Sequence, residues 1–98
     1  MNLPVVYLPE AQDDIDATYA RYDGQRPGLG DRFLNALRQR IDHIQASPAL
    51  DGVFYQQVRA AALRRFPQIV YYRVESAQIL VIAVQHGRRS SRAWQDRA

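Results

Sequence analysis

Cysteine and lysine are absent from this sequence, and it contains no long hydrophobic run. Without cysteine there is neither a disulfide framework nor thiolate chemistry, which fits a reducing compartment. A membrane-spanning helix needs about 20 successive apolar residues, and no such run occurs. The first residues also lack the basic region and apolar stretch of a secretion signal, so we expect a cytoplasmic protein. Because lysine is absent, every basic side chain is an arginine, which stays charged and suits phosphate or carboxylate ligands.

The chain has 98 residues, enough for one hydrophobic core, so we expect residues 1–98 to form a single domain. Its net charge of +3 is unevenly distributed. Residues 1–49 contain five arginines and seven acids, giving −2, whereas residues 50–98 contain eight arginines and three acids, giving +5. A basic C-terminal half predicts an anionic partner, either a nucleic acid or an acidic protein.

Hydrophobic periodicity predicts an α+β fold with the element order β-α-α-β-β-β. The expected elements are a strand at residues 3–8, a helix from residue 10 to near 23, a helix capped by Asp31 that stops at residues 46–52, and strands at 58–66, 68–75 and 79–86. The last strand is apolar on both faces, which is typical of a central strand. Short links between the last three strands favour antiparallel pairing. We therefore expect an antiparallel sheet with a helical hairpin packed across it.

The two histidines and the serine pair near the C-terminus are the candidates for enzymatic chemistry. His43 and His86 lie on different expected elements without the spacing of paired metal ligands, so we expect no metal site and no cofactor. Ser90 and Ser91 lie in an expected loop, and we interpret them as polar loop residues. His86 has two alternative roles: a general base for a ribonuclease acting through the 2′-hydroxyl, or a residue that caps the strand end by hydrogen bonding. We favour the second role.

Arginines cluster on the expected strands of the second half. If residues 58–66 form a strand, Arg59 and Arg65 share one of its faces. Arg73 on the neighbouring strand is then expected to join them in a basic surface on the sheet. A solvated charged face explains each arginine taken alone, but the clustering after residue 58 weakens that explanation.

Four stretches together resemble a known family. They are "VYLPEAQDDID", "GLGDRFLNALRQRIDHIQASP", "VRAAALRRFPQIVYYRV" and "VIAVQHGRRSSRAW". Their order and spacing are similar to those of the RelE/ParE superfamily, the toxins of bacterial type II toxin-antitoxin modules. The resemblance spans nearly the whole chain. It implies a small toxin that is held inactive by a cognate antitoxin whose C-terminal segment wraps around it.

The superfamily divides by target, and the resemblance leaves two functions open. RelE-like members cut mRNA in the ribosomal A site with basic residues on the sheet, assisted by a tyrosine, histidine or glutamate. ParE-like members lack this set and trap cleaved DNA on DNA gyrase without cutting it themselves. The absence of lysine and of any tyrosine after Tyr72 makes this chain more ParE-like. We therefore expect a non-enzymatic gyrase inhibitor, with a RelE-like endonuclease that uses His86 as the alternative.

A third alternative is a nucleic-acid-binding module of low specificity. It predicts affinity for DNA alone, with a steep salt dependence. The net charge of +3 makes this alternative the weakest of the three.

The resemblance and the charge pattern assign the candidate site residues. Arg88, Arg89 and Trp94 are the expected target-binding residues, although the Trp94 ring is also expected to pack over the sheet edge. A second basic target-binding surface is expected from Arg59, Arg64, Arg65 and Arg73. Contacts with a ParD-like antitoxin, in a hetero-oligomer, are expected at Tyr19, Phe33 and Leu37.

Overall fold

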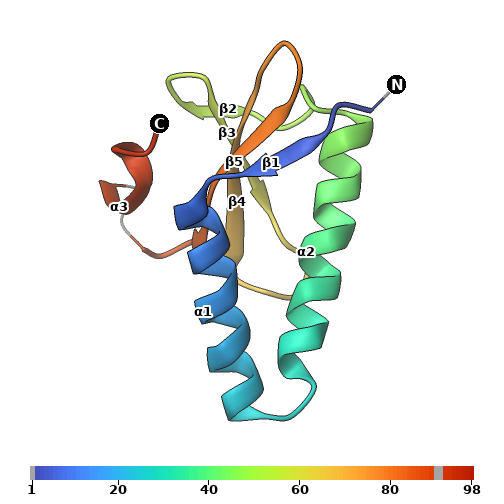
Figure 1. The fold of residues 1–98 in the computed structure, drawn as a ribbon, viewed down its shortest axis with the longest axis vertical. Coiled ribbons are helices and arrows are strands. Elements are labelled where there is room, and N and C mark those ends of the chain that lie inside the picture. The colour runs from blue at the N-terminus through green and yellow to red at the C-terminus, as the bar shows by residue number, and fades with distance from the viewer. Residues whose placement is uncertain (1, 90–91) are drawn as a thin grey trace.

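The computed structural model describes residues 2–89 and 92–98, so the serines at 90 and 91 lie outside the described residues. In chain order the elements are β1 (Val5–Tyr7), α1 (Pro9–Gln25), α2 (Leu29–Ala46), β2 (Val53–Tyr55), β3 (Val58–Ala62), β4 (Gln68–Val74), β5 (Ile79–His86) and α3 (Arg92–Gln95). Figure 1 shows α1 and α2 as an antiparallel hairpin joined by a tight turn. The predicted α+β fold is confirmed, and β2 and α3 are additions to the predicted element order. In the described part of the chain, no helix has the length and apolar character needed to cross a membrane.

The described strands form one five-stranded sheet in the order β1-β5-β4-β3-β2. Strands β3, β4 and β5 are antiparallel neighbours, as their short links predict. Strand β2 also pairs with β3 in an antiparallel direction. In contrast, β1 pairs with β5 in parallel, with Val5 opposite Ile79. The sheet is therefore mixed rather than wholly antiparallel. The reason is that β1 and β5 are separated by most of the chain, so no short turn fixes their relative direction.

The position of each strand in the sheet follows from its composition. Strand β5 lies between β1 and β4, and Val81 and Val84 are each at most 1% exposed, which confirms the predicted central strand. Strand β1 lies at the sheet edge, as expected for a strand that begins next to Pro4, because proline has no backbone N–H for a second neighbour.

The second helix begins earlier than predicted, at Leu29, and its start is not capped by Asp31. Gly28 adopts φ +89°, a left-handed conformation that glycine tolerates, and this reverses the chain directly after α1. The backbone N–H groups of Gly28 and Gly30, at the start of α2, donate to Asp23 Oδ1 at 3.0 and 3.3 Å. Asp31 lies in the first turn of α2, where its carboxylate accepts a hydrogen bond from the Tyr19 hydroxyl at 3.3 Å. Asp23 of α1, rather than Asp31, therefore satisfies the start of α2.

The helical hairpin packs on one face of the sheet, with α1 against β5 and the apolar stripe of α2 completing the same core. The buried side chains of this stripe are Phe33, Leu37, Ile41 and Ile44. Burial of each contributes roughly 1.5–3 kcal/mol to folding. The Phe33 ring also contacts the rings of Tyr22 on α1 and Phe66 in the β3–β4 loop, at centroid distances of 5.7 and 5.9 Å. This aromatic cluster fixes the β3–β4 loop beside the hairpin. Figure 1 shows the end of the sheet from which this loop leaves, next to α2.

The opposite face of the sheet is covered in part by α3. Trp94 is 1% exposed, and its ring stacks on Tyr71 with the centroids 4.3 Å apart. The residues after α3 are held by an ion pair in which Arg97 Nη1 lies 2.7 Å from Asp14 Oδ2. Asp14 also accepts a hydrogen bond from the Val84 backbone N–H at 3.1 Å, and Arg97 donates to the Ile82 carbonyl at 3.2 Å. Strand β1 is short and pairs only with the first residues of β5. The Asp14–Arg97 pair thus supplies hydrogen-bond partners for backbone groups of β5 that lie beyond the end of β1.

Candidate functional site

Several arginine side chains are engaged within the described protein. Four of them join separate parts of the fold: Arg40, Arg59, Arg73 and Arg97. Arg73, for example, lies 3.0 Å from the Glu75 carboxylate and also donates to the Ala98 carbonyl. Hydrogen bonds from Gln78 and Arg73 lower the pKa of the Glu75 carboxyl. Because their guanidinium groups are already engaged, these arginines are poor candidates for binding a partner.

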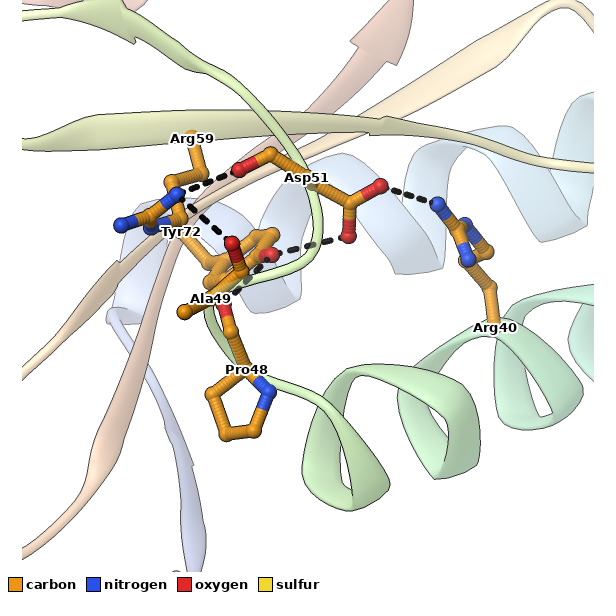
Figure 2. A network of polar contacts seen from close by, with 6 residues as sticks. All are labelled: Arg40, Pro48, Ala49, Asp51, Arg59 and Tyr72. Carbon is orange, nitrogen blue, oxygen red and sulfur yellow. Dashed lines mark hydrogen bonds and ion pairs between the residues drawn. The ribbon is translucent and has the colours of Figure 1, made fainter.

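Figure 2 shows how Arg40 and Arg59 are held by the loop between α2 and β2. Asp51 lies between them: its carboxylate pairs with Arg40, and its backbone carbonyl accepts a hydrogen bond from Arg59. The Tyr72 hydroxyl donates to the same carboxylate at 2.9 Å. Burial, together with the hydrogen bond to Asp51 and its negative charge, raises the pKa of the Tyr72 hydroxyl. This network fixes the loop to α2, β3 and β4, so its role is structural.

The predicted basic surface that unites Arg59, Arg65 and Arg73 is wrong. Strand β3 is shorter than expected, so Arg65 lies in the β3–β4 loop, with φ +67°. In the sheet, Arg59 lies opposite Tyr72, whereas Arg73 lies opposite Val58. Since side chains alternate along a strand, Arg59 is on the face that packs against the hairpin and Arg73 is on the face covered by α3. Arg73 therefore lies opposite the residue next to Arg59, and the two arginine side chains are on opposite faces of the sheet.

Four exposed arginines gather at one end of the sheet, and we call this group the cationic end. They are Arg64 and Arg65 in the β3–β4 loop and Arg88 and Arg89 in the turn after β5. The two segments are adjacent because the Gly87 backbone N–H donates to the Pro67 carbonyl at 2.8 Å. Among the described residues, none of the four guanidinium groups has an ion-pair or hydrogen-bond partner. The cationic end is therefore free to bind an anionic group.

His86 lies exposed at the cationic end, but its ring is engaged in the turn. Its Nδ1 accepts a hydrogen bond from the Arg88 backbone N–H at 3.0 Å, and its carbonyl accepts one from the Arg89 N–H at 2.9 Å. This is the predicted capping role. An imidazole that accepts at Nδ1 carries its proton on Nε2, and neither nitrogen is then a free base. In this arrangement His86 fixes the turn that carries the two arginines.

Trp94 does not belong to the exposed surface, so its expected direct contact with a target is wrong. The ring is buried between Tyr71 and Tyr55, with a T-shaped contact to Tyr55 at 5.9 Å. The sequence predicted that the Trp94 ring packs over the sheet edge, whereas the ring lies on the face of the sheet, against Tyr71 and Ile82. Trp94 anchors the segment that follows the cationic end.

The expected antitoxin contacts are also largely inaccessible. Phe33 is fully buried and Leu37 is 5% exposed, because both belong to the stripe of α2 that packs on the sheet. Sequence periodicity identifies such a stripe but cannot distinguish a core face from a docking face. Tyr19 is partly exposed, and its ring lies over Gly30 at the start of α2.

A groove between α2 and the β3–β4 loop adjoins the cationic end. Its volume is about 550 Å³. Arg32 and Asn35 of α2 line it together with Arg64 and Arg65, and Phe66 contributes apolar surface. Sequence reasoning missed Arg32, because a single arginine on an exposed helix face carries no signal of its own.

The described residues contain no group of three or more histidine, cysteine, aspartate or glutamate side chains close enough to hold a metal ion. What they offer is fixed positive charge at the cationic end. Such an arrangement binds anions, either phosphates or carboxylates.

The fold and this surface define the class of the molecule: a small α+β domain with a cationic end. The family model of the ParE toxin of the type II toxin-antitoxin system, parDE, matches residues 5–91. The chain belongs to the ParE toxin family, which confirms the resemblance found in the sequence.

Other comparisons agree with this fold. A chain of the chromosomal ParDE TA system from P. aeruginosa superimposes with a TM-score of 0.75 at 18% sequence identity, covering 86% of this chain and 95% of that one. At this identity the likeness establishes the fold alone. No curated protein sequence matches the chain.

Proposed function

We propose that this ParE-family toxin acts without catalysis, by binding DNA gyrase through the cationic end and trapping gyrase with cleaved DNA. The observation that carries the proposal is the set of four unpaired arginines beside a histidine whose Nδ1 is already hydrogen-bonded. Such a surface suits an acidic protein face or a DNA phosphate rather than proton transfer. Gyrase bound to DNA offers both, and it acts in the cytoplasm, where we expect this protein.

We also propose that a ParD-like antitoxin neutralises the toxin by forming a hetero-oligomer with it. Membership of the ParE family supports such a partner. A partner that covers the cationic end would have to supply negative charge, since the arginines there remain unpaired within the described protein.

The experiment that tests the gyrase proposal is a cleavage assay with purified gyrase, supercoiled plasmid and toxin. We expect the wild-type chain to accumulate linear DNA linked to gyrase, and the variant Arg88→Ala/Arg89→Ala to lose this effect. The matched control is Arg26→Ala/Arg38→Ala, which removes two exposed charges from the helical hairpin. Full activity in a folded Arg88→Ala/Arg89→Ala variant would refute the assignment of the cationic end. Gel retardation with DNA alone at near-physiological salt separates this function from unspecific DNA binding.

A ribosome-dependent endonuclease is the second candidate, because His86 is exposed beside the arginines. It predicts mRNA cleavage in purified translating ribosomes, which primer extension detects, and loss of that cleavage in His86→Gln. The occupied Nδ1 argues against it, since a base needs a free nitrogen. Cleavage that requires His86 would make this candidate the correct one.

A further inference from the structure

One wall of the groove beside the cationic end is a polar side of α2. The residues of α2 that form most of this wall are Arg32, Asn35, Ala36 and Gln39. Their spacings of three and four residues place them on one side of the helix. The small side chain of Ala36 leaves space between the longer polar side chains, so the wall can receive a ligand.

Both amide side chains on this wall have hydrogen-bonding groups to spare. Asn35 Oδ1 accepts a hydrogen bond from Arg38 at 3.4 Å, and the Asn35 amide N–H groups have no partner among the described residues. The Gln39 amide also has none within the described part of the chain. An amide with a free donor and a free acceptor pairs with the amino group and ring nitrogen at one edge of an adenine base. This wall therefore offers groups that recognise a nucleobase.

The opposite wall is the β3–β4 loop, which is held in a fixed conformation. The Phe66 ring packs against the rings of Tyr22 and Phe33, at centroid distances of 5.3 and 5.9 Å. Next to it, Arg65 adopts φ +67°, a conformation that residues other than glycine rarely adopt. Such conformations occur preferentially at binding sites. A loop that is already ordered also loses less entropy when a ligand binds.

The charge of the groove favours a chain of phosphates. Arg32 lines it from one wall and Arg64 and Arg65 from the other, and no partner of these guanidinium groups occurs among the described residues. None of the described residues that line this groove is acidic. Three guanidinium groups around one groove match the several negative charges of a di- or triphosphate. The groove volume of about 550 Å³ is also in the range of small-molecule sites.

The groove continues into a second hollow of about 280 Å³ with a different lining. The two share three residues, Ala36, Gln39 and Arg64. The Asp42 carboxylate lines the second hollow, and Arg40 lines it too, but the Arg40 guanidinium is engaged in the ion pair of Figure 2. The continuous feature thus has unpaired cations at one end and a hydrogen-bond acceptor at the other. A nucleotide has the complementary polarity, with phosphates at one end and a base that carries a donor amino group at the other.

We propose that the groove binds an adenosine polyphosphate. The phosphates lie against Arg32, Arg64 and Arg65, and the adenine base lies toward the second hollow, where the Gln39 amide pairs with its edge. The inference goes beyond the proposed function and does not depend on it, because the nucleotide binds the toxin alone.

Titration of the isotope-labelled chain with ATP, followed through the backbone amide NMR signals, tests this inference. We expect shifts at residues 32–39 and 64–66. Tripolyphosphate supplies the phosphate chain without the base, and adenosine supplies the base without the phosphates. Each should bind about tenfold more weakly than ATP, because each makes only part of the contacts. Absence of these shifts at millimolar ATP would overturn the proposal, and so would equal affinity for ATP and tripolyphosphate.

Two substitutions separate the phosphate contacts from the base contact. Arg32→Ala should weaken ATP binding about tenfold. Its matched control is Arg26→Ala, which removes an exposed arginine that lines neither hollow and should leave the affinity unchanged. Gln39→Leu keeps a side chain of similar size without the amide, and it should weaken ATP about fivefold without affecting tripolyphosphate. Equal losses in Arg32→Ala and Arg26→Ala would show attraction by general charge and refute the site, whereas full ATP affinity in Gln39→Leu would refute the base contact.

The variant Arg88→Ala/Arg89→Ala distinguishes this inference from the gyrase proposal, because neither arginine lines the groove or the second hollow. We expect it to bind ATP like the wild-type chain while it loses its effect on gyrase. Loss of ATP binding in this variant would place the phosphates at Arg88 and Arg89 and overturn the groove as their site. If the wild-type toxin traps no cleaved DNA, the gyrase proposal fails, while the ATP titration still decides the groove. A single-stranded oligonucleotide that displaces ATP at lower concentration than ATP itself requires would assign the groove to nucleic acid instead.

Discussion

Replacing Tyr72 by phenylalanine removes one hydroxyl from the network of Figure 2 and leaves the ring in place. The hydroxyl donates to the Asp51 carboxylate at 2.9 Å and lies 3.1 Å from the Pro48 carbonyl. A hydrogen bond to a charged group contributes about 1.5–3 kcal/mol, and Asp51 keeps its ion pair with Arg40 in the variant. We therefore expect Tyr72→Phe to lower the free energy of unfolding by about 2 kcal/mol, which lowers Tm by about 10 °C for a domain of this size.

The difference between wild type and Tyr72→Phe should also depend on pH. The pKa of Tyr72 is raised in the folded state, by burial first and then by Asp51, above the value of about 10 in the unfolded chain. Below pH 10 both states are protonated and the contribution is complete. Above it the unfolded chain loses the proton that the folded protein retains, so the stability of wild type falls by about 1.4 kcal/mol per pH unit relative to the variant.

Urea unfolding of both proteins at about pH 8 and about pH 11 measures this difference. The control is Tyr55→Phe, since the Tyr55 hydroxyl only accepts one long hydrogen bond, from Gln56 at 3.4 Å. We expect the gap between wild type and Tyr72→Phe to narrow at the higher pH and the gap for Tyr55→Phe to be small at pH 8. A gap for Tyr72→Phe that stays constant over this range would contradict the raised pKa.

Three further substitutions test the packing. Trp94→Ala removes a buried ring that stacks on Tyr71, and we expect a loss of about 3–5 kcal/mol in urea unfolding; a loss below 1 kcal/mol would show that α3 is not anchored by this ring. Asp14→Ala leaves the Arg97 guanidinium without its carboxylate at a site where the two side chains are only 13% and 17% exposed, so we expect a loss of about 2–3 kcal/mol. In a double-mutant cycle, Asp14→Ala and Arg97→Ala together should cost less than their sum, and additivity would argue against the pair. Gly30→Ala places a methyl group 2.8 Å from the Tyr19 ring, with an expected cost of about 1–3 kcal/mol in thermal unfolding, whereas Gly24→Ala meets nothing within 4 Å and serves as the control.

The helices and the three longer strands could be predicted because their apolar residues follow the helical or the strand period over many positions. Other elements gave no such signal. Strand β2 has only three residues, and it turns into β3 through Gln56 at φ +51°, where neither glycine nor asparagine marks a turn. Strand β3 ended early because Arg65 also adopts a positive φ, which sequence does not reveal for an arginine. Helix α3, with four residues, is shorter than any periodicity can identify.

The candidate site could be predicted in part. Sequence reasoning assigned Arg64, Arg65, Arg88 and Arg89 to target binding, but not as one group, since only the pairing of β4 with β5 brings their loops together. It could not separate them from the structural arginines. Arg59 is held by backbone carbonyls, and Arg97 by Asp14 at the other end of the sequence, and neither kind of partner leaves a local pattern.

The division of the arginines bears on how the surface can change in evolution. Arg40, Arg59, Arg73 and Arg97 have partners within the protein, so their replacement disturbs the fold. The guanidinium groups of the cationic end have no ion-pair or hydrogen-bond partner among the described residues, so these arginines can be exchanged at little cost in stability. A chain built in this way can alter this exposed surface while it keeps its core.

The pairing of β1 with β5 has a consequence for the kinetics of folding. Val5 lies opposite Ile79, so the sheet is complete only after the chain has closed a loop that contains both long helices and three strands. Contacts between residues so far apart in sequence slow folding, because the entropy of loop closure is lost before the contact forms. The hairpin of α1 and α2 can form early from local contacts, but its apolar stripe remains uncovered until the strands arrive. A chain in which the hairpin has formed before the strands pair exposes this stripe, and it is then more prone to aggregation and proteolysis than the folded protein.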